Sequence, residues 1–191
     1  TGKVDYVNGR FAFIISDEIE QDVLVRTEDL KTALDDDIVK VRIFSVKKDG
    51  RPLGAVTEII KRYRMEFVGR IEVHNNYAFV IPDFKKMHHD IFVRVEGIKK
   101  AKNNDKVIAR IIDWKEGDKN PLGEVIKILG PAGNNDAEIH SIMAEFGLPF
   151  EFDRSLIVQS EKISEIIKTD EIKKRKDFRK ITTFTIDPED A

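Results

Sequence analysis

The residues best suited to chemistry are aromatic side chains that alternate with small apolar ones in residues 77–94, YAFVIPDFKKMHHDIFVR. Successive side chains of a β-strand point to opposite faces, so Tyr77 and Phe79 share one face of a first strand. Phe92 and Arg94 have the same spacing on a second strand. If the two strands pair, three rings and a guanidinium form one patch, and such a patch can stack bases.

Residues 11–26, FAFIISDEIEQDVLVR, repeat this layout nearer the N-terminus. Phe11 and Phe13 take the aromatic positions and Arg26 the cationic one, whereas Leu24 stands where the second copy has a phenylalanine. The repeat extends further, because ALDDDIVKVRI and PLGAVTEII in the first copy answer AKNNDKVIARI and PLGEVIKIL in the second. The offset between matched residues drifts only from 66 to 69, which predicts two tandem domains of similar size.

Alternating apolar residues and turn pairs predict five strands in each copy, and hence a mainly β protein. Asn8-Gly9 and Asp49-Gly50 indicate hairpin turns, because both positions of such pairs tolerate positive φ. Thr27 is the expected N-cap of a short helix or turn over residues 27–34. Five antiparallel strands in roughly 65 residues suit a small closed barrel of the oligonucleotide-binding (OB) type, with an SH3-like barrel as the competing architecture. The first copy's strands are expected at residues 3–8, 10–16, 22–26, 38–46 and 54–62.

The aromatic residues have two interpretations. Rings that alternate along a strand commonly belong to a hydrophobic core. Here Ala12, Ile14, Ala78 and Val80 already supply an apolar inward face, and rings on the same side would leave these strands without a polar face. The pattern therefore favours exposed rings, more strongly in the second copy than in the first.

Composition limits the other functions. The 191 residues carry a net charge of −2, and only residues 67–130 hold more Lys and Arg than Asp and Glu, 12 against 9. Without cysteine there are no disulfides and no cysteine-based zinc sites or nucleophiles. His88 and His89 with Asp83 and Asp90 form a weak metal-site candidate, and a polar surface loop is the better interpretation. With no apolar run that could cross a membrane and no signal-peptide pattern, we expect a cytoplasmic protein.

The sequence changes character after residue 130. A linker, GPAGNN, precedes an expected helix at about residues 137–146, capped by Asn135 or Asp136 and stopped by Gly147. Its apolar residues at helical spacing are Ile139, Ile142, Met143 and Phe146. A second helix is expected at residues 154–168, with Asp153 as cap and a buried stripe made by Leu156, Ile163, Ile166 and Ile167. The basic run 173–180 suits either phosphates or a solvated helix face, and residues 182–186 are expected to form a strand.

Two of these stretches resemble cold-shock domains. GRFAFI is similar to the K-G-F-G-F-I ribonucleoprotein motif of that family, and DVLVR and DIFVR are similar to its V-F-V-H strand. The resemblance implies OB-type barrels that stack bases of single-stranded nucleic acid. Its stacking positions fall on Phe11 and Phe13, then on Tyr77, Phe79 and Phe92. The chain departs from the motif at Leu24 and by arginine in place of histidine at Arg26 and Arg94.

The last residues, TTFTIDPEDA, resemble the entrance to the catalytic domain of the RNase II/RNase R exoribonuclease family, where T-I-D-x-x-D-A precedes K/R-D-F-D-D-A. GNNDAEIHSIMAEFGLP and RKDFR resemble the same family. The resemblance implies processive, hydrolytic 3′-to-5′ RNA degradation with Mg²⁺ in the parent enzyme. Asp187 matches the first of four metal-binding aspartates, Asp190 lies on the motif without being one of them, and D-F-D-D is absent. We therefore expect this chain to bind no Mg²⁺ and to be inert by itself.

The expected organisation is a first barrel at residues 1–66, a second at 67–130, and the beginning of the catalytic domain at 131–191. The expected role is that of a monomeric region that binds single-stranded RNA and feeds it to a catalytic domain. A stand-alone RNA chaperone with tandem cold-shock domains is the alternative, and a protein-interaction scaffold is a third interpretation that the weak net charge allows.

Overall fold

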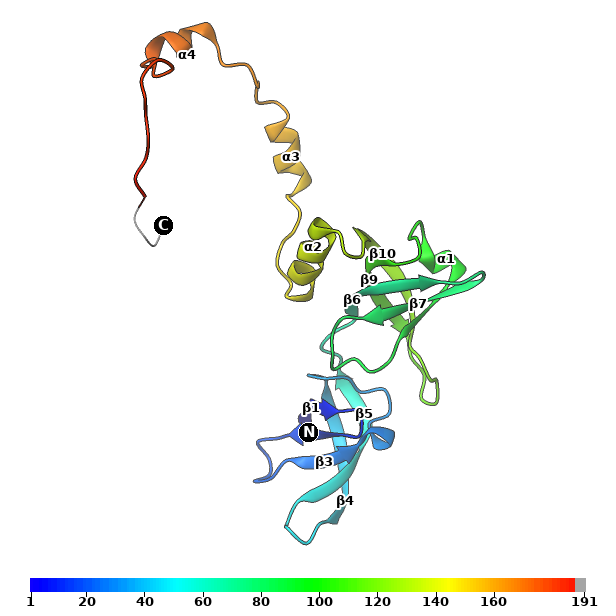
Figure 1. Cartoon of the computed structure of the whole chain (residues 1–191). Coiled ribbons are helices and arrows are strands. Elements are labelled where there is room, and N and C mark those ends of the chain that lie inside the picture. The colour runs from blue at the N-terminus through cyan, green and yellow to red at the C-terminus, as the bar shows by residue number, and fades with distance from the viewer. Residues whose placement is uncertain (188–191) are drawn as a thin grey trace. The chain divides into compact units, whose positions relative to one another are not determined.

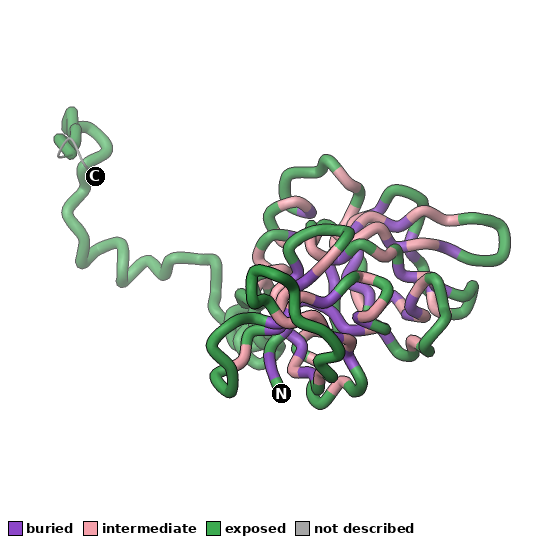
Figure 2. Tube along the Cα trace, turned by 90° about the horizontal axis from the view of Figure 1, so that it is seen from below, coloured by how far each residue is buried: buried purple, intermediate pink, exposed green. Residues whose placement is uncertain are grey.

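The computed structural model describes residues 1–187 (Figure 1). The chain divides into two compact units, residues 1–150 and the segment from Glu151 onward. Both barrels lie in the first unit, which contains all the buried residues of the described part of the chain, whereas residues 151–187 of the second unit are exposed (Figure 2). Among the described residues, no helix has both the length and the apolar composition needed to cross a membrane.

The first barrel closes with the strand order β1-β2-β3-β5-β4, in which β1 also pairs with β4. Its pairs are antiparallel except that of β3 with β5, where Leu24 lies opposite Leu53 in a parallel register. The expectation that all pairs are antiparallel was thus wrong for β3 and β5, which close the barrel at a parallel seam. These two strands are joined by a crossover through β4 rather than by a hairpin. The elements are β1 (Gly2–Asn8), β2 (Phe11–Ile15), β3 (Val23–Arg26), the 3-10 turn η1 (Thr27–Asp29), β4 (Ile38–Val46) and β5 (Pro52–Lys61).

The second barrel repeats this topology, with the order β10-β8-β7-β6-β9 and one parallel pair between β8 and β10. A closed five-stranded Greek-key barrel is the OB architecture, so the duplication and the OB fold predicted from the sequence are confirmed. The elements are β6 (Glu66–Val73), β7 (Tyr77–Pro82), β8 (Ile91–Arg94), the short helix α1 (Val95–Ile98), β9 (Asp105–Asp113) and β10 (Leu122–Pro131).

Two local details differ from the expectation. Thr27 does not cap a helix: it is the first residue of η1, and the capping position is Arg26, whose side chain makes no capping hydrogen bond. Asn8-Gly9 does form a turn, but through the Asn8 side chain, whose Oδ1 accepts the N–H of Arg10 at 2.9 Å, rather than through positive φ at the glycine. Gly50 has the expected positive φ of 85°.

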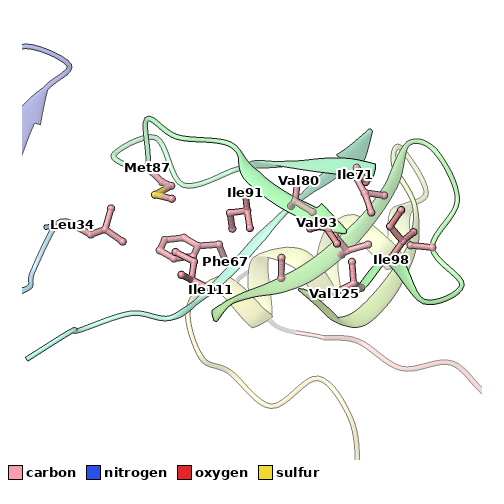
Figure 3. Packing of buried hydrophobic residues seen from close by; sticks show 14 residues of the cluster. Leu34, Phe67, Ile71, Val80, Met87, Ile91, Val93, Ile98, Ile111 and Val125 are labelled. Carbon is pink, nitrogen blue, oxygen red and sulfur yellow. The ribbon is translucent and has the colours of Figure 1, made fainter. Parts of the chain in front are cut away.

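Alternate residues of the strands fill each barrel. In the second barrel, Ile71, Val80, Ile91, Val93 and Val125 point into one cluster (Figure 3). The first barrel has its own cluster, built in the same way from the inward residues of its strands. This alternation leaves the other face of each strand to the surface, which is where the aromatic residues predicted to stack bases lie.

The barrels contact each other through the loop between η1 and β4. Leu34 of that loop is 5% exposed and belongs to the second barrel's cluster, near Met87 (Figure 3). Nζ of Lys86 lies 3.0 Å from a carboxylate oxygen of Asp5 and 3.0 Å from one of Asp35. Burial lowers the pKa of Lys86, but the hydrogen bonds to these two carboxylates outweigh it and hold the pKa above its usual value. The expectation that the barrels touch is confirmed.

Matched positions in the two copies explain the charge at this contact. Oδ1 of Asp35 accepts the backbone N–H of Tyr6 at 2.7 Å, and Oδ1 of Asn103 accepts that of Val73 at 2.9 Å in the second barrel. A neutral asparagine therefore suffices for the backbone bond. The negative charge at Asp35 serves the contact with Lys86.

Helix α2 (Asn135–Glu145) follows the second barrel. Its cap is Asn134, whose side chain accepts the N–H groups of Asp136 and Ala137, so the predicted cap was one or two residues too late. The predicted stop is confirmed, because Gly147 has φ of 66° and the next N–H bonds back to Met143 at 2.8 Å.

The apolar side of α2 faces outward. Ala137 and Ser141 are the buried residues of the helix, whereas Ile139, Ile142 and Phe146 are exposed. Small residues let the helix lie close to the strands, where the Cβ of Ala137 would lie 3.2 Å from a Cβ added at Gly130. The face of α2 that packs on the barrel is therefore the one whose small residues allow the helix to approach the strands closely, and not the one with apolar residues at helical spacing.

The second unit contains α3 (Arg154–Ser160) and α4 (Thr169–Lys174). Asp153 caps α3 as predicted, accepting the N–H of Ser155 at 2.8 Å, but the helix ends at Ser160 rather than at residue 168. The predicted buried stripe of Leu156, Ile163, Ile166 and Ile167 is exposed, because nothing within the described part of the unit covers it.

The strand expected at residues 182–186 is irregular, exposed chain, because a strand needs a neighbour to accept its backbone hydrogen bonds. In the basic run, Arg175 pairs with Glu171 at 3.2 Å and Arg179 with Asp177 at 2.8 Å on an exposed surface, as in the solvated interpretation. Asp190 and the rest of residues 188–191 lie outside the described part of the chain.

Candidate nucleic-acid interface

Three aromatic rings meet on the outside of the second barrel. Phe79 of β7 lies directly opposite Phe92 of β8, and their ring centroids are 5.7 Å apart. Tyr77 completes the group at 5.7 Å from Phe79 and 5.9 Å from Phe92. Their neighbours Ala78 and Val80 are fully buried, so the rings face outward as predicted, with Tyr77 38% exposed. We call Tyr77, Phe79 and Phe92 the ring surface.

A cation and a further ring adjoin the ring surface. Arg94 lies opposite Tyr77 in the β7–β8 register and is exposed. The imidazole of His74 stacks on the ring of Tyr77, with centroids 4.8 Å apart and planes 26° from parallel. His74 was not predicted, because the matched residue of the first copy is Val7 and the repeat carries no aromatic there.

An open groove of about 420 Å³ lies at the edge of the ring surface. Phe92 is opposite Leu122 of β10, and Leu122 is opposite Asp113 of β9, so Phe79, Phe92, Leu122 and Asp113 form one row across four strands. The β9–β10 loop closes the groove. Its full lining is Phe79, Phe92, Arg94, Asp113, Lys115, Asp118, Lys119, Asn120 and Leu122. The one feature of the sequence that singled out Leu122 is the Pro-Leu-Gly segment that both copies share.

The first barrel has a smaller version of this surface. The rings of Phe11 and Phe13 are 5.6 Å apart, and Phe13 lies opposite Leu24, which supplies no ring. Arg51, which was not predicted, places its guanidinium 5.4 Å from the centre of the Phe13 ring. Arg26 is exposed and lies 3.3 Å from Glu28.

The loops beside the two surfaces differ in charge. Between β2 and β3, residues 16–22 hold four carboxylates and no lysine or arginine. Between β7 and β8, residues 83–90 hold two lysines and two aspartates. Carboxylates repel phosphates, so the second barrel is the better surface for a nucleic-acid backbone.

The candidate histidine site does not assemble. Nδ1 of His89 lies 3.1 Å from the carbonyl oxygen of Lys119, and Asp83 forms an ion pair with Lys106 at 2.6 Å. Burial lowers the pKa of His89. His88 instead packs its ring against Tyr6 of the first barrel, with centroids 5.0 Å apart. Within residues 1–187, no group of three or more His, Asp or Glu side chains could hold a metal ion.

Asp187 lies in exposed, irregular chain of the second unit. A site for two divalent ions needs several carboxylates around ions about 4 Å apart. The other candidate residues predicted from the sequence, from Phe11 to Arg94, all belong to the barrels.

Tandem OB-type barrels with outward aromatic residues on β2, β7 and β8 define the class as cold-shock-like OB domains. Family models agree: residues 2–59 match the ribonuclease B OB domain, and residues 79–153 match the cold shock domain. Along its entire length, the sequence matches ribonuclease R, a member of the RNase II/RNase R exoribonuclease family.

Ribonuclease R of Thermotoga maritima is 33% identical over 193 residues, which cover 100% of this chain and 27% of that protein. Ribonuclease R of Aquifex aeolicus is 28% identical over 195 residues, with the same coverage of 100% and 27%. The chain thus spans about a quarter of the length of the curated relatives it matches.

Solved structures show the same fold. RNase R of Mycoplasma genitalium, in complex with ribose-methylated single-stranded RNA, matches with a TM-score of 0.72 at 23% identity, over 89% of this chain and 27% of that one. The yeast pseudonuclease Ssd1 matches with a TM-score of 0.67 at 18% identity, over 77% and 25%.

Proposed function

We propose that this chain is the RNA-binding region of an RNase R-like 3′-to-5′ exoribonuclease, which binds single-stranded RNA and feeds it to a catalytic domain. The observation that carries the proposal is the ring surface, three aromatic side chains turned outward beside Arg94. The complex of Mycoplasma genitalium RNase R with ribose-methylated single-stranded RNA supports it. RNA is the proposed partner, the chain acts as a monomer, and the proposed compartment is the cytoplasm.

The geometry favours single strands over duplexes. Unpaired bases expose their flat faces and can stack on Tyr77, Phe79 or Phe92, whereas a duplex buries those faces in its own stack. Each base has such a face, so stacking tolerates many sequences. Arg94 and the lysines of the neighbouring loops supply charge for the phosphates between stacked bases.

Single-stranded RNA should therefore bind more tightly than duplex RNA of the same sequence, and its affinity should fall as salt rises. Fluorescence anisotropy at several salt concentrations measures both. Arg94→Ala should reduce the slope of log K against log salt by about 0.7 if it contacts one phosphate. Arg26→Ala is the matched control, since the equivalent arginine lies beside Glu28. The absence of a salt-dependent RNA affinity would favour the scaffold interpretation instead, and tighter binding of duplex RNA would contradict the proposed preference for single strands.

We further propose that the 191-residue chain does not hydrolyse RNA by itself. Hard divalent cations take oxygen ligands, and a two-ion mechanism needs several carboxylates around them. Of the family's four aspartates the sequence carries Asp187 alone. End-labelled single-stranded RNA incubated with the chain and Mg²⁺ should keep its length. Shortening clearly above a buffer blank, and abolished by Asp187→Asn, would contradict the proposal.

A further inference from the structure

We propose that the groove beside the ring surface is a base-selective subsite that prefers guanine, with Asp113 as the residue that reads the base. The inference deepens the proposed function and rests on it, because it concerns one nucleotide of the bound single strand. It starts from the groove of about 420 Å³ that joins the ring surface to the β9–β10 loop. That volume has room for one nucleotide.

The apolar side chains of the groove suit the flat face of a base. Phe92 and Leu122 lie opposite each other on β8 and β10, and both line the groove. Neighbouring strands are about 4.8 Å apart, so a base lying over these two side chains ends within reach of the next strand. The residue opposite Leu122 on that strand is Asp113, which also lines the groove.

The chemistry of Asp113 selects the edge of the base. An ionised carboxylate only accepts hydrogen bonds, and its two oxygens accept two parallel N–H groups best. Among the four RNA bases, guanine alone presents two adjacent donors, N1–H and the N2 amino group, on its Watson–Crick edge. Uracil offers one donor between two carbonyl oxygens that a carboxylate repels. Adenine and cytosine offer an amino group beside an acceptor nitrogen.

The remaining groups of the groove fit the rest of a guanosine nucleotide. Lys115 lies 3.9 Å from Asp113 and can donate to the O6 oxygen of the same base. Arg94 and Lys119 line the groove as cations for the flanking phosphates. Asn120 is held by its Nδ2, which donates to the carbonyl oxygen of Asp90 at 2.8 Å. With three cations against Asp113 and Asp118, the groove keeps a positive balance.

The first barrel provides an internal comparison. In its register, Leu53 lies opposite Ser45 on one side and Leu24 on the other. Serine therefore occupies the position of Asp113, and leucine that of Phe92. The residues that would stack and read guanine belong to the second copy alone, so the selectivity should be a property of the second barrel.

The test compares oligouridines of about 12 nucleotides, a length within OB site sizes, that carry one central G, inosine or U. Anisotropy with the whole chain should show the G oligomer binding about 5- to 150-fold more tightly than the U oligomer, the range for one bidentate base contact. Inosine lacks the N2 amino group and should lose most of this gain. Asp113→Asn should remove the preference for G, measured as the ratio of the affinities for the G and U oligomers.

Glu116→Gln is the matched control, since it removes one negative charge from the same loop at a residue outside the groove lining. It should keep the preference for G, and circular dichroism checks that both variants are folded. Equal affinities for G, inosine and U overturn the subsite, as does Asp113→Asn with its preference intact. If all-U RNA still binds and Phe92→Ala still weakens it, the proposed function survives that failure. If no oligomer binds, both proposals fall.

Discussion

Phe92→Ala is expected to weaken binding of single-stranded RNA about 5- to 150-fold, or about 1–3 kcal/mol for the loss of one stacking partner. Phe92 lies within 6 Å of both other rings of the ring surface, Phe79 and Tyr77. It also joins that surface to the groove through Leu122. Removing it therefore takes away one of the three rings and part of the apolar lining of the groove. Equilibrium titration of labelled RNA, followed by anisotropy, measures the loss.

Leu24→Ala supplies the control for Phe92→Ala, because it truncates the matched position of the first barrel. Leu24 is half-buried and lies opposite Phe13, as Phe92 lies opposite Phe79. Both truncations remove a half-buried apolar side chain, so both should lower the Tm modestly. Only Phe92→Ala should weaken RNA binding. A fall in Tm with RNA affinity unchanged would make Phe92 a structural residue and remove the main support for the interface.

The barrels were predictable because successive side chains of a strand point to opposite faces, which assigns each residue to the inside or the outside. Ala78 and Val80 had to face inward if Tyr77 and Phe79 faced outward, and the internal repeat checked that assignment a second time. The parallel seam between β8 and β10 was not predictable from spacing, because it depends on how the barrel closes. That seam places Leu122 beside Phe92, so the groove was missed while the rings were found.

The region after residue 134 shows the opposite case. Apolar spacing predicts a buried stripe only where another surface exists to cover it. The residues of α2 that pack against the strands are Ala137 and Ser141, whose small size permits close packing. The side chain of Ile142 is exposed instead. In the second unit Ile163 and Ile166 have the spacing of a buried stripe and no cover within its described residues. Capping residues were found to within two positions, because a cap depends on local backbone geometry alone.

Asp37→Ala is expected to lower the free energy of unfolding by about 3–5 kcal/mol, the range for removing one partner of a buried ion pair. Asp37 is fully buried, and its Oδ2 lies 2.7 Å from Nη1 of Arg62. The same carboxylate accepts the backbone N–H groups of Leu34 at 2.8 Å and Tyr63 at 2.9 Å. Burial raises the pKa of Asp37 even though these three partners act to lower it. The carboxylate is therefore desolvated, and its three hydrogen-bond donors replace water. Truncating it would leave all three donors without the acceptor they share.

Asp36→Asn is the neighbouring control for Asp37→Ala, because Asp36 has a φ of 66°, which asparagine tolerates better than alanine. Asp36 pairs with Lys3 at 3.1 Å on the surface, where both side chains are well exposed, so its loss should cost less than about 1 kcal/mol. Urea titration of both variants at neutral pH gives the two free energies. Because Asp37 ties the loop that carries Leu34 to the linker residues Arg62 and Tyr63, its loss should also loosen the contact between the barrels. Equal costs for the two variants would show that Asp37 does not hold this loop.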